Sequence, residues 1–336
     1  MANKKNAAQH EQALISKDFF DSEISVNIHK IFPVAVIATM SSGKSTLINA
    51  LLEKEILPNS NAACTSKVFS ILDKDDNDTT SAYVCKKNKT QKYDQDIKKV
   101  LADANVDDDV KSVLIVDEIK KITNTNKSLL IIDTPGPNNS SDINHEQIMK
   151  NVLDKLNGGM IIYVINATQN GILDDKSTMG IVKQYMLKIP RLKIVFVVNK
   201  IDELDFEKES VEEFMNKTKE FISESGFQDA DIIPVSALGG QLFKKVLKGI
   251  PLTRHETSKF DYLYELFKPR DVNLITYAHL SEMPNLHSKV SLNDKEYRVS
   301  DLMLAIEHTG IDYLTNYIQN KQISSENHNH LCVKIK

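Results

Sequence analysis

The sequence contains 336 residues, enough for about two domains of ordinary size or for one domain with large insertions. Hydrophobic residues make up 41% and charged residues 26%, which excludes a wholly disordered chain. The formal net charge of −4 argues against a general nucleic-acid coat protein, which carries a basic excess, so we expect no nucleic-acid partner.

The chain begins with a polar stretch over residues 1–10. Residues 11–29 follow with Ile15, Phe19, Ile24 and Ile28 at near-helical spacing, which predicts an amphipathic helix. The apolar face of such a helix needs a partner surface. The body of the domain is the simplest candidate for that surface.

Between residues 31 and 237, apolar strand patterns alternate with helical patterns. This alternation predicts an α/β fold with a mostly parallel sheet that is covered by helices on both faces. We expect residues 67–72 and 81–86 to form a hairpin, and residues 113–122 to pair with 129–133. The predicted strands are 31–38, 67–72, 81–86, 113–122, 129–133, 160–167, 193–200 and 231–237, and the predicted helices are 46–55, 94–104, 145–156, 174–187 and 207–225.

Residues 239–299 break the alternation and are interpreted as an insertion, with a strand pair near 288–298. Gly310 then marks the end of one helix, and the apolar face after it predicts a closing helix that ends near residue 322. The polar residues 323–336 are expected to form a flexible tail.

Cys64, Cys85 and Cys332 are too widely spaced for a disulfide framework or a zinc site, which favours a reducing, cytoplasmic location. The N-terminus has no apolar signal core. The longest apolar runs, such as 160–165 and 193–198, are far shorter than the ~20 residues of a membrane-spanning helix. Any membrane contact is therefore expected to be peripheral, and nothing in the sequence supports one.

Residues 38–45 fit the phosphate-binding pattern GxxxxGK[ST], except that Ala38 replaces the first glycine. The context is right, because a strand pattern precedes it and a helix pattern follows. Backbone N–H groups at a helix N-terminus converge on phosphate oxygens, and Gly43 permits their close approach. Lys44 would reach the β- and γ-phosphates, and the Ser45 hydroxyl would bind Mg²⁺. The predicted phosphate-binding residues are Ser41, Ser42, Gly43, Lys44, Ser45 and Thr46.

A second motif, Asp133-Thr134-Pro135-Gly136, stands at the end of a predicted strand. Asp133 would hold Mg²⁺ through water, and the Gly136 N–H would bind the γ-phosphate. His145 could enter this site from the following helix, although a surface position at the helix N-terminus is the simpler interpretation.

Two further strand ends carry residues suited to a guanine base. In Asn199-Lys200-Ile201-Asp202, the Asp202 carboxylate can accept hydrogen bonds from guanine N1–H and the 2-amino group, which adenine does not offer in that arrangement. In Ser236-Ala237, a backbone N–H would read guanine O6. Ligands of open α/β sheets bind at the carboxyl ends of strands, so the four motifs in this order predict a GTP and GDP site with Mg²⁺.

The four motifs are those of P-loop GTPases, and the chain resembles bacterial dynamin-like GTPases. The resemblance rests on MSSGKST, on the spacing before DTPGPNNS and on Thr65 within NAACTSKV, and it covers residues 30–240 and the closing helix TGIDYLTNYI. It implies a dynamin-like G domain over 30–322. It also implies that Ser41 contacts the γ-phosphate side and that Thr65 binds Mg²⁺ and holds the attacking water. The implied catalytic residues are Ser41, Lys44, Thr65 and Gly136, and the implied metal ligands are Ser45, Thr65 and Asp133.

Two departures from related GTPases concern hydrolysis. Met40 stands where dynamins carry a glutamine that organises the water, and Pro137 stands where Ras-like proteins carry one. The phosphate-binding loop contains no arginine, so unassisted hydrolysis should be slow. Backbone groups, Thr65, Ser41, a bound monovalent cation or a partner protein would have to supply the missing help.

Two interpretations of function remain. The favoured one is a Mg²⁺-dependent GTPase that forms a homodimer across its nucleotide face, as dynamins do. The alternative is a GTP-binding switch or scaffold with little hydrolysis, which Ala38 and Met40 favour. Because the predicted closing helix ends near residue 322, we expect no dynamin stalk in this sequence. The predicted helix over 11–29 is either a fragment of the neck bundle or, more simply, a cover for the domain.

Overall fold

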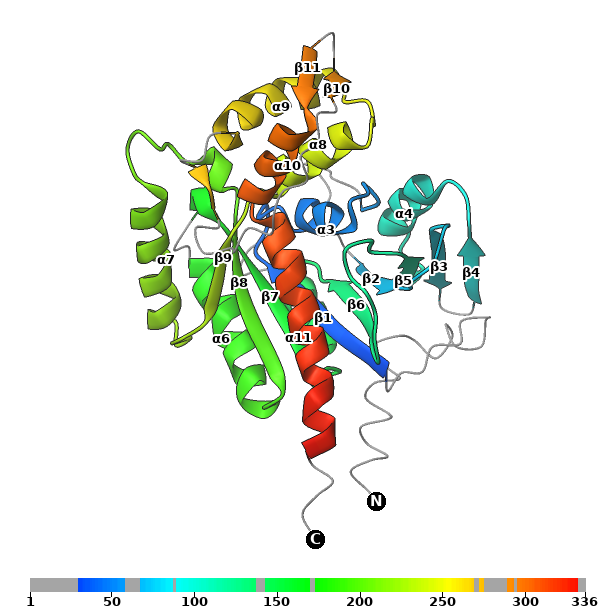
Figure 1. Cartoon of the computed structure of the whole chain (residues 1–336). Coiled ribbons are helices and arrows are strands. Elements are labelled where there is room, and N and C mark those ends of the chain that lie inside the picture. Colours follow the sequence, from blue (N-terminus) through cyan, green and yellow to red (C-terminus); the bar gives the residue numbers. More distant parts are fainter. Residues whose placement is uncertain are drawn as a thin grey trace, which may run out of the picture.

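The computed structural model describes residues 30–57, 67–86, 89–136, 143–169, 173–268, 272–274, 289–292 and 295–331 (Figure 1). The helix predicted over 11–29, Thr65 and the loop at 137–141 lie outside the described residues. Among the described helices, none is both long enough and apolar enough to cross a membrane.

A nine-stranded sheet forms the centre of the molecule, in the order β4-β3-β5-β2-β6-β1-β7-β8-β9. The neighbours from β6 to β9 are all parallel, which confirms the predicted mostly parallel sheet. The carboxyl ends of these strands therefore lie along one edge. The strands are β1 (Ile31–Ala38), β2 (Val68–Asp73), β3 (Ser81–Lys86), β4 (Lys89–Tyr93), β5 (Val110–Asp117), β6 (Ser128–Asp133), β7 (Gly159–Asn166), β8 (Leu192–Asn199) and β9 (Asp231–Pro234).

Both predicted strand pairings on the other side of the sheet are wrong. The strands β2 and β3 do not form a hairpin, because β5 lies between them, parallel to β2 and antiparallel to β3. Likewise, β5 and β6 are separated by β2. Apolar periodicity identifies a strand but not its neighbour, which is chosen by packing between distant segments. The strand β4, which the sequence analysis missed, lies at the sheet edge and is lysine-rich and mostly exposed.

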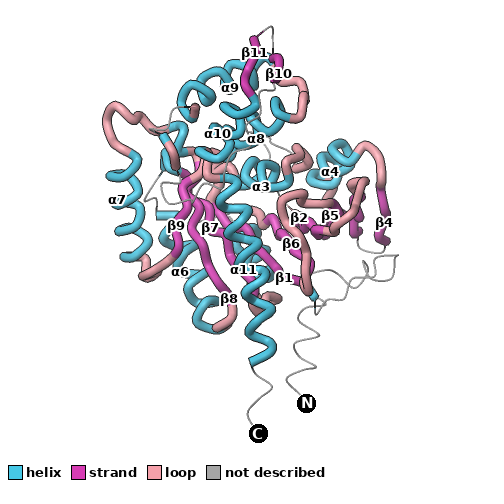
Figure 2. Tube along the Cα trace, in the orientation of Figure 1, coloured by secondary structure: helices cyan, strands magenta, loops and turns pink. Residues whose placement is uncertain are grey.

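Helices cover both faces of the sheet, as Figure 2 shows. Alternate residues of β1 separate the two layers: Val34 and Val36 pack with α3 and α11, whereas Ala35 and Ile37 pack with α5 and α6. The predicted α/β class with helices on both sides is confirmed. The main-layer helices are α3 (Lys44–Leu52), α4 (Ile97–Val106), α5 (Ile143–Leu153), α6 (Leu173–Lys188), α7 (Val211–Glu224) and α11 (Ile311–Leu331).

Several helix boundaries depend on local capping. The helix α7 begins after Ser210, four residues later than predicted, because Ser210 and Glu213 form a reciprocal capping box. At the other end of the chain, α11 begins after Gly310, which has a φ of 77°. It continues to Leu331 rather than ending near residue 322, so the segment predicted as a flexible tail is helical in its first part.

A separate apolar core lies under the C-terminal helices that gather at the top of Figure 1. It is rich in aromatic residues, with Phe243 packed edge-on against Phe260, and Tyr297 against Tyr264. The predicted strand pair is confirmed, but α8 belongs to the main fold as well, because it follows β9 directly and packs on α3. These elements are α8 (Ala237–Leu247), α9 (Arg254–Phe267), β10 (Lys289–Leu292), β11 (Lys295–Arg298) and α10 (Val299–His308).

A buried carboxyl group ends strand β2. Asp73 accepts hydrogen bonds from the Ile119 N–H at 2.8 Å and from Asn124 at 3.0 Å. Burial, together with the neighbouring charge of Asp75, raises the pKa of Asp73 to about 7 despite these two hydrogen bonds, which lower it. Because the folded state holds this proton more tightly than the unfolded chain, Asp73 lowers the stability of the fold as pH rises from about 4 to about 7.

We expect the substitution Asp73→Asn to remove this pH dependence. The variant loses the bond from Asn124, but its stability relative to the wild type should improve by roughly 1 kcal/mol per pH unit between pH 5 and 7. Urea unfolding of both proteins at pH 5, 6, 7 and 8 measures this difference. Asp78→Asn, on an exposed neighbour, is the control. A pH-independent difference between Asp73→Asn and wild type would contradict the expectation.

Candidate functional site

The loop over residues 39–43 connects the carboxyl end of β1 to the N-terminus of α3. It turns through two left-handed residues, Ser41 with φ 60° and Gly43 with φ 81°. A Cβ atom on Gly43 would lie 2.4 Å from the Asn199 amide nitrogen, so this position requires glycine for space as well as for conformation. The loop therefore has the backbone shape that directs consecutive N–H groups toward an anion at a helix N-terminus.

Two asparagines hold this loop from the sheet. Asn199, at the end of β8, donates to the Ser42 carbonyl at 2.9 Å and accepts from the Ala237 N–H at 3.0 Å. Asn166, at the end of β7, donates to the Ser41 carbonyl at 3.2 Å. The sequence analysis included Asn199 but missed Asn166. Its position at a strand end in register with Asn199 could have identified it, but only once the pairing of β7 with β8 was known.

Lys44 and Asp133 form a buried ion pair behind the loop. Asp133 is fully buried, and burial raises the pKa of its carboxyl group, against the opposing effect of the Lys44 charge. Its second oxygen, Oδ2, has no partner among the described residues, and the same is true of the buried Ser42 hydroxyl. Buried polar atoms are normally hydrogen-bonded, so these two atoms mark a place where a bound polar group would be favourable.

The residues after Asp133 pack closely against β1. The Thr134 hydroxyl donates to the Val36 carbonyl at 2.8 Å, and a Cβ atom on Gly136 would lie 2.7 Å from the Ala38 carbonyl. His145 lies 3.0 Å from the Gly136 carbonyl through Nδ1. His145 thus lies half-buried in the first turn of α5, as the simpler interpretation expected, and it also contacts the second motif.

A further buried polar atom without a partner in the described residues lies near the ends of β8 and β9. Asp202 is 5% exposed, and its Oδ1 atom has no partner within the described part of the chain. Burial raises its pKa, while a hydrogen bond with Ser236 lowers it. The Tyr262 hydroxyl of α9 donates to the Asp202 carbonyl at 3.4 Å. A buried carboxylate oxygen in this state would bind a ligand that supplies N–H donors.

The loop after β9 is held by the C-terminal helices. The Ser236 hydroxyl caps α8 by accepting from the Gly239 N–H at 3.1 Å, and the Ser236 N–H donates to the Thr309 carbonyl at 2.9 Å. These contacts place Ser236 and Ala237 beside Asn199, so the last two predicted motifs meet in space. Ser45 and Thr46 lie in the first turn of α3, next to Lys44.

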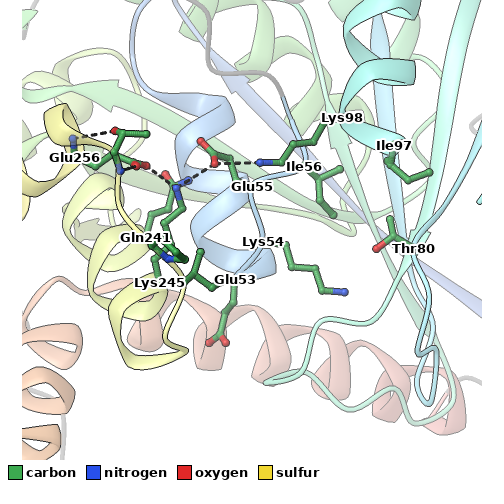
Figure 3. A pocket seen from close by; sticks show the side chains of 13 residues that line it. Glu53, Lys54, Glu55, Ile56, Thr80, Ile97, Lys98, Gln241, Lys245 and Glu256 are labelled. Atoms are coloured by element: carbon green, nitrogen blue, oxygen red, sulfur yellow. Dashed lines mark hydrogen bonds and ion pairs between the residues drawn. The ribbon is translucent and has the colours of Figure 1, made fainter. Parts of the chain in front are cut away.

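A separate cavity of about 530 Å³ lies at the C-terminal end of α3, away from this loop (Figure 3). Four of its charged side chains pair with one another: Glu55 contacts Lys98 at 3.2 Å and Lys245 at 3.1 Å, and Lys245 also pairs with Glu256. The cavity therefore joins α3, α4, α8 and α9 through ion pairs and shares no lining residue with the four motifs.

A sequence model of the dynamin family matches residues 34–201, half of the chain. The chain belongs to the dynamin family. Two curated relatives are sulfate adenylyltransferase subunit 1 proteins of Bacteroides. The one from Bacteroides thetaiotaomicron is 26% identical over 129 residues, which cover 38% of this chain and 24% of the relative. The one from Bacteroides fragilis is 31% identical over 122 residues, which cover 34% of this chain and 22% of the relative.

A solved structure of an oligomerised bacterial dynamin pair, described in connection with the long-range sensing and tethering of membranes, is also similar to this dynamin-family chain. It is 18% identical with a TM-score of 0.49, and the match covers 98% of this chain and 51% of that one. This dynamin-family chain therefore spans about a quarter of the length of the two curated relatives and about half of that structure.

Proposed function

We propose that this dynamin-family protein binds GTP and hydrolyses it to GDP and phosphate. The observation that carries the proposal is the buried Oδ1 atom of Asp202, which has no partner in the described chain and lies in a motif tied to the phosphate-binding loop through Asn199. Guanine N1–H and its 2-amino group are donors that match this acceptor. A site built for such donors rejects adenine, because this oxygen would then stay buried without a hydrogen bond.

The rest of the site supports the triphosphate. The N–H groups of residues 42–46 would surround the phosphates, and Lys44 would exchange its bond with Asp133 for the β- and γ-phosphate oxygens. The Asp133 Oδ2 atom fits a magnesium site, since a carboxylate oxygen is the donor type that Mg²⁺ prefers and this one has no partner in the described residues. Ser45 and Thr65 would supply hydroxyl ligands. When bound, Mg²⁺ would neutralise charge on the phosphates.

Hydrolysis is proposed to depend on a second copy of the chain. Met40 lies within the phosphate-binding loop and is 44% exposed, so the loop presents an apolar side chain there rather than a water-binding amide. The loop carries no arginine, so beyond Lys44 it offers no second cationic side chain for the transition state. A symmetric dimer across the nucleotide face would hold Thr65 against the nucleotide and exclude water, with Ser41, the Gly136 N–H and a bound monovalent cation stabilising the developing charge.

We therefore expect specific GTPase activity to rise with protein concentration. Light scattering should find a monomer or weak dimer with GDP, and a tighter dimer with GDP–aluminium fluoride or a non-hydrolysable GTP analogue.

Magnesium chelation should abolish turnover. Thr65→Ala, which loses the proposed metal and water contact, controls for contaminating GTPases. A monomer in all three states with concentration-independent turnover would reject the dimer and support the alternative of a GTP-binding switch, for which the exposed Met40 is the specific observation.

A further inference from the structure

Asn166 and Asn199 form a matched pair at the phosphate-binding loop. They lie opposite each other in the register of β7 and β8, at the last residue of each strand. Both are buried, with 3% and 2% exposure. Their side-chain amides donate to two successive carbonyls, those of Ser41 and Ser42. The loop is thus held at two consecutive peptide groups by two neighbouring strands.

The orientation of the Asn166 amide is fixed by its other contacts. Its oxygen accepts from the Thr168 N–H at 3.0 Å and from the Thr168 hydroxyl at 2.8 Å. Its nitrogen is therefore the atom that faces Ser41, and it also lies 3.3 Å from the Gln169 side-chain oxygen. An aspartate could satisfy Thr168 but could not donate to Ser41.

Fixing a carbonyl also fixes the N–H of the same peptide group. In a trans peptide the C=O and N–H bonds point in opposite directions. Asn166 holds the carbonyl of the Ser41–Ser42 peptide group toward the end of β7. The N–H of the same peptide group, which belongs to Ser42, must therefore point away from β7 and into the loop. Asn199 orients the Gly43 N–H in the same way. Ser41 needs such a contact, because a left-handed φ of 60° is unfavourable for a non-glycine residue.

We propose that Asn166 is a positioning residue that aims the Ser42 N–H at a nucleotide phosphate. The proposal rests on the proposed GTP site and extends it by one residue outside the four motifs. Asn166 acts on phosphate binding through the Ser41 carbonyl. Within the described part of the chain, none of its hydrogen bonds involves Asp202, so base recognition should not depend on Asn166.

The test is the near-isosteric substitution Asn166→Asp. This variant keeps the acceptor for Thr168, loses the donor to Ser41 and places a carboxylate oxygen against the Ser41 carbonyl. Affinity for GDP, measured by displacement of a fluorescent GDP analogue, should fall by about tenfold. Affinity for guanosine, which lacks phosphates, should stay within about twofold in the same displacement assay, as should the preference for GDP over ADP.

Gln169→Ala is the matched control, because it removes the other acceptor of the same amide and leaves the Ser41 bond intact. It should bind GDP within about twofold of wild type. Thermal melting without nucleotide checks the folding of Asn166→Asp. If that variant does not fold, Asn166→Ser, which is too short to reach Ser41, should show the same selective loss for GDP.

Wild-type GDP affinity in Asn166→Asp would overturn the positioning role, and so would an equal loss of guanosine and GDP binding, which indicates general damage to the site. Failure of the proposed function is distinguishable, because the wild-type protein itself would then not bind the fluorescent GDP analogue, and both proposals would fall.

Discussion

Replacing Lys44 by alanine is expected to abolish GTP turnover, reduce GTP affinity at least ~100-fold and destabilise the nucleotide-free protein. The first two effects follow from the loss of the charge that would bind the phosphates. The third follows from the ion pair, because Asp133 is fully buried and Lys44 is the cation that contacts it. Removing one partner of a buried pair costs about 3–5 kcal/mol. GTP hydrolysis, GDP displacement and urea unfolding measure the three effects.

The stability that Lys44→Ala loses should depend on pH, and the direction of this dependence follows from the Asp133 carboxyl group. Burial already raises the pKa of Asp133, and without Lys44 the pKa should rise further. When the pKa of a carboxyl group is raised in the folded state, the folded protein loses stability as pH increases from the unfolded-state pKa through the folded-state pKa. The stability deficit of Lys44→Ala should therefore be smaller at pH 5 than at pH 8.

A second variant separates folding from binding. Lys44→Met with Asp133→Asn removes both charges and keeps similar volumes, so it should recover most of the stability but none of the GTP binding. Lys44→Ala with wild-type stability at pH 8 would show that the ion pair contributes nothing to the fold.

Asp202→Asn is expected to change which base the protein accepts. The amide of asparagine can donate to the 2-oxo group that replaces the 2-amino group of guanine in xanthine, so affinity for xanthosine nucleotides should rise. Affinity for GTP should fall at least ~100-fold, because two donors of guanine lose their charged acceptor. Displacement of a fluorescent nucleotide by GDP, XDP and ADP measures the change.

The fold should tolerate this substitution. Burial raises the pKa of Asp202, so its ionised form costs stability near neutral pH, and the nucleotide-free variant should be at least as stable as wild type at pH 7.5. Glu203→Gln is the matched control, since Glu203 is the exposed neighbouring carboxylate that lies 3.6 Å from Lys200. Equal competition by ATP and GTP in the wild-type protein would reject the guanine assignment.

The sequence predicted the parallel half of the sheet well. Strands β1, β6, β7 and β8 are runs of apolar residues buried on both faces, so the local sequence is enough to identify them. Three of them, β1, β6 and β8, also end at a predicted motif. The other half was mispaired. The strands β2, β3 and β5 are also mostly buried. Their periodicity does not show that β5 lies between β2 and β3 in the sheet.

The candidate site divides in a similar way. Gly43, Lys44, Asp133, Asn199 and Asp202 were predicted from the sequence, because phosphate, metal or base recognition calls for particular residue types at a particular spacing. The structure brings them together, and their binding roles are part of the proposed function. Their contacts in the folded chain were not predicted. The buried ion pair of Lys44 with Asp133, for example, joins residues that are 89 positions apart.

By itself, the sequence determined the four motifs and the chemistry that they predict, since motif residues, their order and their places after apolar strands are local properties. Tertiary structure alone decided which strands are neighbours, that α11 continues to Leu331 and that Asn166 reaches the Ser41 carbonyl. Each of these depends on contacts between residues far apart along the chain. The free energy of such contacts comes from packing and burial, which the spacing of residue types does not specify.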